Sequence, residues 1–367
     1  MPLATASVVG PDDVEAEDMT AAEENPADAV VWMIRGQWVT LSVRAAVELG
    51  IFDRAGEPTT VGDLAAAASC DPGALVRLVR VMVDLGLVEV VGATAGATVG
   101  VGNLVSVTPR GAVLARGHRS GLRDLLLTQT VLPNLASWQR LADAVRTGSS
   151  VYEVVNGVGQ WEFLNANPEL GASFDAAMAR RGSDQAAALI GSCDLSGVGT
   201  IVDVGGGRGA MLAEVLRVTP GLRGVVADRP AVAAAAQVFL AEVGLADRAT
   251  AVATDFFAEV PSGGDRYVIA NVLHDWADTD AVRILKTIRS AMDSTACLWV
   301  VERILDAPDR PFEALRDLHL VDLHMLVMFG ARERTVAEYD ALLRAAGFTA
   351  RLVRTDRTWD LIEARPN

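Results

Sequence analysis

Cysteine is scarce in this 367-residue chain. Its three cysteines, Cys70, Cys193 and Cys297, are scattered and lack the spacing of metal ligands, which argues against a disulfide framework or a zinc site. No apolar run reaches the ~18 residues that a membrane span requires. The N-terminus has neither the basic residues nor the apolar core of a secretory signal. We therefore expect a cytoplasmic protein without a membrane segment.

Basic residues are also few, because 32 Lys and Arg stand against 47 Asp and Glu and leave a formal net charge of −15. Residues 1–24 contain seven acids and no Lys or Arg, a composition that predicts a disordered, solubilising acidic tail. The rest of the chain is still acidic and should repel a polyanion. Nucleic acid is therefore not expected as a ligand.

A small N-terminal domain is expected over residues 25–116. After a first helical stretch, Thr60 or the threonine before it can cap a short helix. Asp71 and Pro72 open a second helix, which Gly86 ends. A glycine-rich hairpin follows. Helix, turn, helix and hairpin in this order are typical of a winged-helix unit.

The second helix of that unit can be interpreted in two ways. Arg77 and Arg80 lie where a winged helix would meet DNA, which would make the protein a transcriptional regulator. Apolar residues on nearly every face of the helix favour burial against another domain or subunit instead. Because the net charge opposes DNA binding, we predict a dimerisation domain and a homodimer.

Residues 117–195 read as a helical connector, with a break at Pro133 and a new helix after Asn167 and Pro168. Aromatic and methionine side chains here and near residue 325 can form a broad apolar pocket for a planar aromatic molecule. The candidates, each of which could equally be ordinary core, are Trp138, Trp161, Phe163, Met178, His324, Met325 and Met328.

From residue 196 to residue 367 the pattern changes to strands alternating with helices, which is typical of parallel strands joined by crossovers. The last two strands are joined by a turn so short that they must pair antiparallel. We therefore predict a Rossmann-like α/β domain with a seven-stranded sheet. The expected strands are 200–204, 224–228, 249–254, 266–272, 297–304, 350–355 and 359–365.

The stretch "TIVDVGGGRGAMLAEVL" (200–216) joins the first of these strands to a helix through a glycine turn. Glycine has no Cβ, so a ligand can approach such a turn closely. Gly205, Gly207 and Ala210 satisfy the dinucleotide template G-x-G-x-x-G/A, and Asp228 ends the second strand where an acid can bind a ribose. An NAD-dependent oxidoreductase is therefore one alternative.

Two further acids favour a different adenosine ligand. Asp203 stands just before the glycines, where it would oppose a pyrophosphate but suit a ligand with ammonium and sulfonium charges. Asp255 ends the third strand, where it could accept from an adenine amino group while Phe256 lies on the ring. With Asp228 between them, these acids predict S-adenosylmethionine as the cofactor.

The motifs "DVGGGRG", "TDFF", "NVLHDWADTDAVRIL" and "DLHMLVMFGARERTVAEYDALLRAAGF" resemble those of class I S-adenosylmethionine-dependent O-methyltransferases of the plant caffeate type. The nearest resemblance is to the bacterial enzymes that tailor natural products such as mitomycins and aromatic polyketides. It covers roughly residues 27–365, with the motifs in family order. It implies a seven-stranded methyltransferase domain, a winged-helix dimerisation domain and a role in antibiotic biosynthesis.

The resemblance also implies roles for individual residues. His274 matches the family's general base, flanked by Glu302 and Glu333. The cofactor would be held by Asp203, Gly205, Gly207, Asp228, Arg229, Asp255 and Phe256. The chain departs from the family pattern at Ala270-Asn271, where a basic residue is common, and at Gly182, where serine is common.

These residues are suited to methyl transfer to a phenol. Only ~0.1% of a phenol with a pKa near 10 is ionised at neutral pH, whereas a histidine with an unperturbed pKa of ~6.5 is mostly neutral and can take its proton. We expect Asp275 to cap the following helix. No cluster with the arrangement of a catalytic magnesium site is apparent, so metal independence is predicted.

Overall fold

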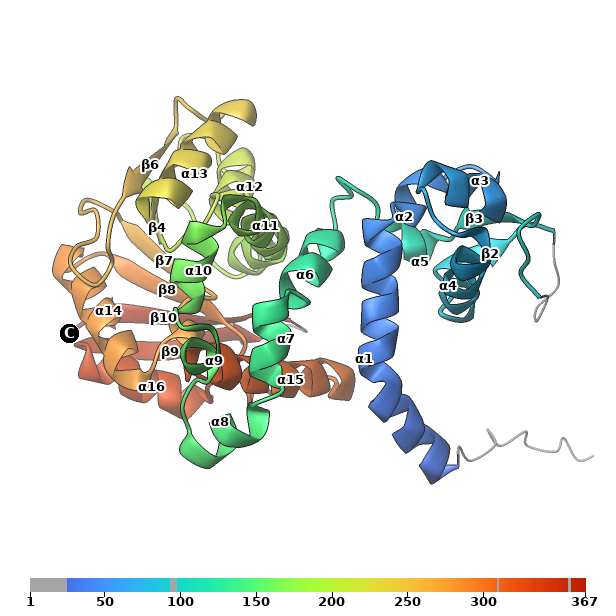
Figure 1. The fold of residues 1–367 in the computed structure, drawn as a ribbon. Coiled ribbons are helices and arrows are strands. Elements are labelled where there is room, and N and C mark those ends of the chain that lie inside the picture. Colours follow the sequence, from blue (N-terminus) through green and yellow to red (C-terminus); the bar gives the residue numbers. More distant parts are fainter. Residues whose placement is uncertain (1–24, 93–97, 309, 356–357) are drawn as a thin grey trace, which may run out of the picture.

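The computed structural model describes residues 25–92, 98–308, 310–355 and 358–367. An N-terminal lobe and a larger C-terminal lobe built on a twisted sheet are joined by helices (Figure 1). The predicted acidic tail lies outside the described residues. None of the described helices is long and apolar enough to cross a membrane.

The N-terminal lobe confirms the predicted order of helix, turn, helix and hairpin. Thr60 and Asp71 cap their helices by accepting from the backbone N–H groups of Asp63 and Ala74, and Gly86 takes a positive φ of 65°. Its antiparallel strands are ordered β1-β3-β2. The elements are α1 (Pro26–Glu48), α2 (Ile51–Arg54), β1 (Thr59–Thr60), α3 (Val61–Ala67), α4 (Pro72–Asp84), β2 (Val88–Val90), β3 (Leu104–Val107) and α5 (Pro109–Ala112).

Of the two arginines that could have met DNA, Arg80 has a structural partner in this lobe. Arg80 donates from Nε and Nη2 to the carbonyl of Val99, at 3.1 and 2.8 Å, and so ties α4 to the chain that leads into β3. One face of α4 packs into the lobe's core through Leu75, Val79 and Met82. Apolar residues are exposed instead on α1, which runs beside the joining helices (Figure 1).

The connector is helical, as predicted, and Pro133 and Pro168 each lie in the first turn of a helix. At Gly182 a side chain would not fit, because a Cβ there would lie 2.8 Å from the backbone nitrogen of Met211. Helix α11 therefore approaches closely the start of helix α12 (Ala210–Val218). The connector helices are α6 (Leu122–Gln129), α7 (Leu132–Trp138), α8 (Leu141–Thr147), α9 (Tyr152–Asn156), α10 (Gln160–Ala166) and α11 (Pro168–Ile190).

The C-terminal sheet has seven strands in the order β6-β5-β4-β7-β8-β10-β9, which confirms the predicted number. Strands β4 to β8 pair parallel, and β10 pairs antiparallel with both β8 and β9. The strands are β4 (Thr200–Val204), β5 (Arg223–Asp228), β6 (Ala249–Ala253), β7 (Arg266–Ala270), β8 (Cys297–Glu302), β9 (Phe348–Thr355) and β10 (Asp360–Pro366).

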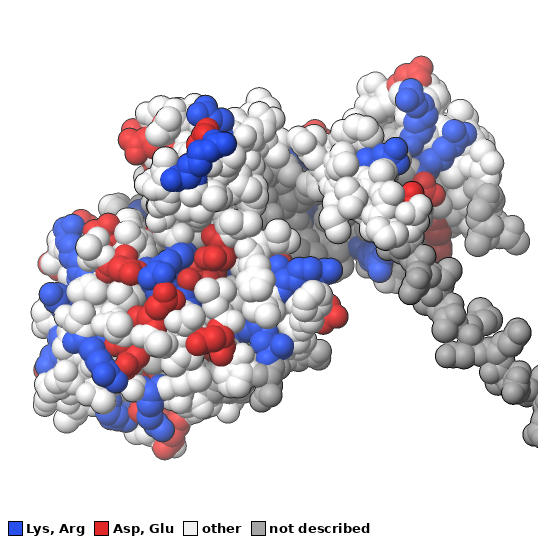
Figure 2. Space-filling model, turned by 90° about the horizontal axis from the view of Figure 1, so that it is seen from below, with Lys and Arg blue, Asp and Glu red and all other residues white. Residues whose placement is uncertain are grey.

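Helices and apolar cores cover both faces of this sheet. Because β4, β5, β6 and β7 are parallel, their carboxyl ends meet at one edge, and the loops that follow them lie together. The remaining helices are α12 (Ala210–Val218), α13 (Pro230–Glu242), the short 3₁₀ helix η1 (Leu273–Asp275), α14 (Asp278–Ala291), α15 (Phe312–Phe329) and α16 (Val336–Ala345). On the face seen from below, acidic and basic side chains are interspersed over this lobe (Figure 2).

Candidate active site

A cavity of about 1610 Å³ lies beyond the carboxyl ends of β4 to β7. The glycine turn after β4 and the ends of β5 and β6 line one half of it. Helices α1, α6, α7, α9, α10, α11 and α15 line the other half, together with η1. The volume exceeds the 300–1,000 Å³ typical of a site for one small molecule. The cavity therefore has room for two ligands side by side.

The glycine turn has the backbone geometry that its sequence predicts. Gly205, Gly207 and Gly209 have positive φ angles of 72°, 57° and 79°. A Cβ at Gly206 would lie 2.5 Å from Oδ2 of Asp203. Any other residue would be strained at these positive φ angles, and its side chain would occupy space on the cavity side of the turn. The glycines therefore leave the backbone accessible to a ligand.

Asp228 both holds the glycine turn by hydrogen bonds and lines the cavity. Its Oδ2 accepts from the N–H of Gly207 at 2.9 Å, and its Oδ1 accepts from the N–H of Arg229 at 2.7 Å. The side chain lines the cavity at the end of β5. The loop after β4 and the end of β5 are thereby fixed to one another, with a carboxylate positioned for ribose hydroxyls.

Asp203 is buried at the end of β4, and burial raises its pKa to about 7. Among the described residues, neither of its carboxyl oxygens has a hydrogen-bond partner. A buried carboxyl without a partner is costly, and a cationic ligand group in the cavity would supply the missing charge. This feature fits S-adenosylmethionine and does not fit a pyrophosphate.

The remaining predicted cofactor residues also line the same half of the cavity. Asp255 accepts from the N–H of Phe257 at 3.0 Å. Phe256 packs edge-on against Phe257 and Trp276, which holds its ring in place. All seven residues predicted to hold the cofactor are cavity-lining, although they come from the ends of three strands: Asp203, Gly205, Gly207, Asp228, Arg229, Asp255 and Phe256.

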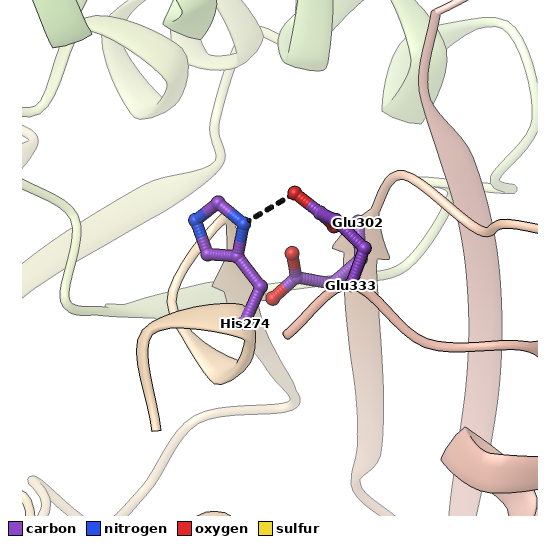
Figure 3. Close-up of side chains that lie close together, drawn as sticks. All are labelled: His274, Glu302 and Glu333. Atoms are coloured by element: carbon purple, nitrogen blue, oxygen red, sulfur yellow. Dashed lines mark hydrogen bonds and ion pairs between the residues drawn. The ribbon is translucent and has the colours of Figure 1, made fainter. Parts of the chain in front are cut away.

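His274 lies on η1 in the wall of the cavity, with buried carboxylates behind it (Figure 3). Its Nδ1 is 2.8 Å from Oε1 of Glu333. The Oε1 atom of Glu302 accepts from the backbone N–H groups of Val272 and Leu273, at 3.1 and 2.8 Å. Glu302 therefore anchors the loop that carries the histidine, and Glu333 orients its ring.

The carboxylates change the proton affinity of His274. Burial by itself disfavours the imidazolium, but the charges of Glu333, Asp275 and Glu302 outweigh it and raise the pKa of His274 to about 9. Burial also raises the pKa of Glu302, to about 7. The expectation of a mostly neutral imidazole at neutral pH, taken from the unperturbed pKa, is therefore wrong for this site.

The structure corrects the role expected of Asp275. Helix α14 is capped at Ala277, not at Asp275. Asp275 is instead part of η1, and its Oδ1 lies 3.4 Å from Nε2 of His274. An acid shortly before a helix is typical of a cap, which is why the sequence predicted one. In the structure the 3₁₀ turn directs this carboxylate toward His274 instead.

Two buried arginines support the cluster, and the sequence analysis did not single them out. Arg303 pairs with Glu333 at 3.6 Å and with Asp317 at 3.1 Å. Arg334 donates to the carbonyls of Leu273 and Trp276, at 2.8 and 2.7 Å, and so fixes η1. Both arginines directly follow a predicted acid in the sequence, which is the one signal that could have identified them.

One nitrogen of His274 and one oxygen each of Glu302 and Glu333 lie within 4.8 Å of one another, a spacing that could also surround a cation. Nδ1 of His274 and one oxygen of each glutamate already take part in hydrogen bonds, to one another or to two backbone N–H groups. The arrangement is that of an oriented proton acceptor.

The other half of the cavity contains six of the seven predicted pocket residues: Trp138, Trp161, Phe163, Met178, His324 and Met325. Trp138 donates from Nε1 to Nδ1 of His324 at 3.1 Å. Met328 was predicted here wrongly, since it is absent from the lining of this cavity, is buried with Val327 and Tyr152, and faces a smaller neighbouring cavity.

Comparison with known proteins identifies two family domains. Residues 33–116 match the O-methyltransferase dimerisation domain, and residues 138–349 match the O-methyltransferase domain. Over 355 residues the chain is 35% identical to a phenazine O-methyltransferase of Lysobacter antibioticus, covering 94% of this chain and 99% of the relative.

Solved structures agree. A mitomycin 7-O-methyltransferase superposes with a TM-score of 0.83 at 33% identity, covering 93% of this chain and 98% of that one. An O-methyltransferase of neocarzinostatin biosynthesis, solved with S-adenosylmethionine and 2-hydroxy-5-methyl naphthoic acid, has a TM-score of 0.74 at 31% identity. The match covers 89% of this chain and 96% of that one.

Proposed function

Because this chain belongs to the S-adenosylmethionine-dependent O-methyltransferase family, we propose that it methylates a phenolic hydroxyl of an aromatic natural product with His274 as the general base. The observation that carries the proposal is the buried imidazole held between carboxylates in the wall of a cavity for two ligands. The nicotinamide and DNA-binding alternatives are not supported, since both matched domains are those of O-methyltransferases.

Bound S-adenosylmethionine would supply an activated methyl group on a sulfonium. The protein's task is to align the acceptor and to remove its proton. Because Nδ1 of His274 donates to Glu333, the proton is accepted at Nε2. The phenolic O–H bond breaks as the new C–O bond forms, and the carboxylates of Glu333 and Glu302 stabilise the imidazolium.

We propose that the strand-end residues hold the cofactor in the half of the cavity nearest the sheet. Asp203 would meet its cationic methionyl part, and Asp228 its ribose. Asp255 and Phe256 would meet its adenine. Because Gly205 and Gly207 have no Cβ, their backbone would lie close to the cofactor.

Calorimetry with S-adenosylhomocysteine, with NAD titrated in parallel, tests the cofactor. Micromolar binding of the first and none of the second is expected. Phenols are then screened with labelled S-adenosylmethionine, with a chelator present throughout because the proposed mechanism needs no metal. Binding of NAD alone would contradict the proposed cofactor. Activity that a chelator abolishes would contradict a mechanism without a metal.

Activity should rise with pH through the slightly alkaline range. Nε2 of His274 accepts a proton only when the imidazole is neutral, and the pKa of about 9 keeps it mostly protonated below that pH. We expect kcat/KM to rise roughly tenfold per pH unit below this pKa. Glu333→Gln removes a charge that raises the pKa and should shift this limb to lower pH. If the rise of kcat/KM with pH stayed at the same pH in this variant, it would report the ionisation of the acceptor's own hydroxyl.

We propose that the chain is a homodimer through its N-terminal lobe. Several large apolar side chains on α1 are exposed, Ile34 and Trp38 among them. Replacing these two with glutamate should give a monomer by light scattering, because charge would then lie on a face that pairs by apolar contact. Val218→Glu, an equally exposed change on α12, is the matched control. A wild-type monomer at micromolar concentration would contradict the dimer.

A further inference from the structure

A buried amide lies in the wall of the cavity, in the half away from the sheet. Gln160 of α10 is 8% exposed and is one of the residues that line the cavity. Its Oε1 is buried and, among the described residues, has no hydrogen-bond partner. A buried carbonyl oxygen without a donor is costly. This wall therefore contains a hydrogen-bonding group that a ligand with a donor can satisfy.

Gln160 belongs to the same part of the wall as the proposed base. Gln160, Trp161 and Asp275 line both the main cavity and the smaller neighbouring cavity of about 600 Å³, so they lie where the two cavities adjoin. Oδ1 of Asp275 is 3.4 Å from Nε2 of His274, the atom proposed to take the proton of the methyl acceptor. A ring placed with its hydroxyl at Nε2 therefore lies beside the stretch of wall to which Gln160 belongs.

The neighbours of Gln160 on α10 hold this helix in place. Trp161 stacks on Phe329 of α15, with 5.3 Å between the ring centroids. The guanidinium of Arg229 lies 5.0 Å from the centroid of the Trp161 ring and donates to Oδ1 of Asn165, one turn later, at 3.1 Å. An amide on a helix fixed in this way is preorganised, and a preorganised group discriminates well between ligands.

We propose that Gln160 is a specificity-determining residue, whose Oε1 accepts a hydrogen bond from a second O–H or N–H group on the ring that carries the reacting hydroxyl. The inference rests on the proposed function, because it concerns the methyl acceptor of that same site. Oε1 has already lost its water in the folded chain, so the new hydrogen bond costs no further desolvation at this atom. Rings with such a group are therefore selected over rings with a methyl group in its place.

Matched pairs of a dihydroxy ring and its methyl analogue isolate this hydrogen bond. The probes are 2,3-dihydroxynaphthalene with 3-methyl-2-naphthol, and 1,3-dihydroxynaphthalene with 3-methyl-1-naphthol, which place the second group on the next ring carbon or on the one beyond it. Binding is measured by calorimetry on the full chain saturated with S-adenosylhomocysteine, so the readout does not require turnover. In at least one pair we expect the dihydroxy compound to bind about tenfold more tightly than its methyl analogue.

Gln160→Met tests whether the amide causes this preference, because methionine has a similar length and no strong hydrogen-bonding group. The ratio of the two affinities should fall about tenfold, so that the pair binds almost equally. The same change removes a buried amide oxygen without a partner, so the melting temperature of the ligand-free chain should rise. A glutamine with only a structural role would instead lower the melting temperature and weaken both members of a pair equally.

Gln129→Met is the matched control. Gln129 of α6 also lines the cavity, but its side chain is exposed and water can satisfy its amide. This variant should leave the ratio of affinities unchanged.

Three results would each overturn the proposal: equal binding within both pairs in the wild-type chain, no binding of either dihydroxynaphthalene, or a ratio that Gln160→Met leaves unchanged. Failure of the proposed function would look different. In that case none of the four compounds would receive labelled methyl, whatever their relative affinities.

Discussion

Replacing His274 with alanine is expected to lower turnover by ~10²-fold or more, because the acceptor would have to lose its proton without a base. The affinity for S-adenosylmethionine should stay nearly unchanged, since the residues that line the cofactor half are untouched. Rates come from transfer of labelled methyl, and affinities from calorimetry. His274→Gln, which keeps some of the ring's volume, should behave in the same way.

His319→Ala is the matched control, because His319 is exposed on α15 and outside the cavity lining. It should retain full activity. If the His274 variants were also fully active, the histidine would have no part in the mechanism, and alignment of the two ligands alone would carry the reaction.

Asp228→Ala should weaken binding of S-adenosylhomocysteine by about 10²-fold. The change removes the carboxylate expected to meet the ribose, and it also removes the acceptor of two backbone hydrogen bonds that fix the glycine turn. Calorimetry measures the loss directly. Asp228→Asn, which keeps a carbonyl oxygen, should lose less.

Asp265 provides the control for this experiment. Its Oδ2 likewise accepts two backbone N–H groups, those of Gly199 and Thr200, but at the opposite ends of the strands. Asp265→Ala should lower the melting temperature and leave cofactor affinity almost unchanged. An equal loss of affinity in both variants would mean that Asp228 acts only through stability.

The predictable part of the site is the part that depends on short-range patterns. Acids that end parallel strands must meet at one edge of the sheet, so Asp203, Asp228 and Asp255 were placed together without knowledge of any side-chain contact. The antiparallel final strands followed from a turn too short for a crossover. Family motifs added His274 and its two glutamates. In the structure Glu333 hydrogen-bonds to the histidine ring, and Glu302 accepts from the N–H groups of the two residues before the histidine.

The unpredicted part depends on where side chains point after packing. From the sequence Asp275 is expected to cap the following helix, and only the 3₁₀ turn reveals that its carboxylate lies beside His274. Met325 and Met328 lie three residues apart on the same helix, yet Met325 lines the cavity and Met328 packs in a core cluster. The pKa of His274 depends on the charges of Glu302, at the end of β8, and of Glu333, in the loop after α15. Both are distant in sequence, so no local pattern predicts their effect.

Helix α1 lines the cavity through Met33, Gln37 and Thr40 while its neighbouring face carries the exposed apolar side chains of the N-terminal lobe. Selection on either face therefore acts on the other, since a substitution that adjusts the fit of a new acceptor also alters the surface on which two copies would meet. Such a chain is expected to diversify in substrate and in subunit pairing together. Two recently separated descendants would then lose the ability to form mixed assemblies as their chemistries diverge.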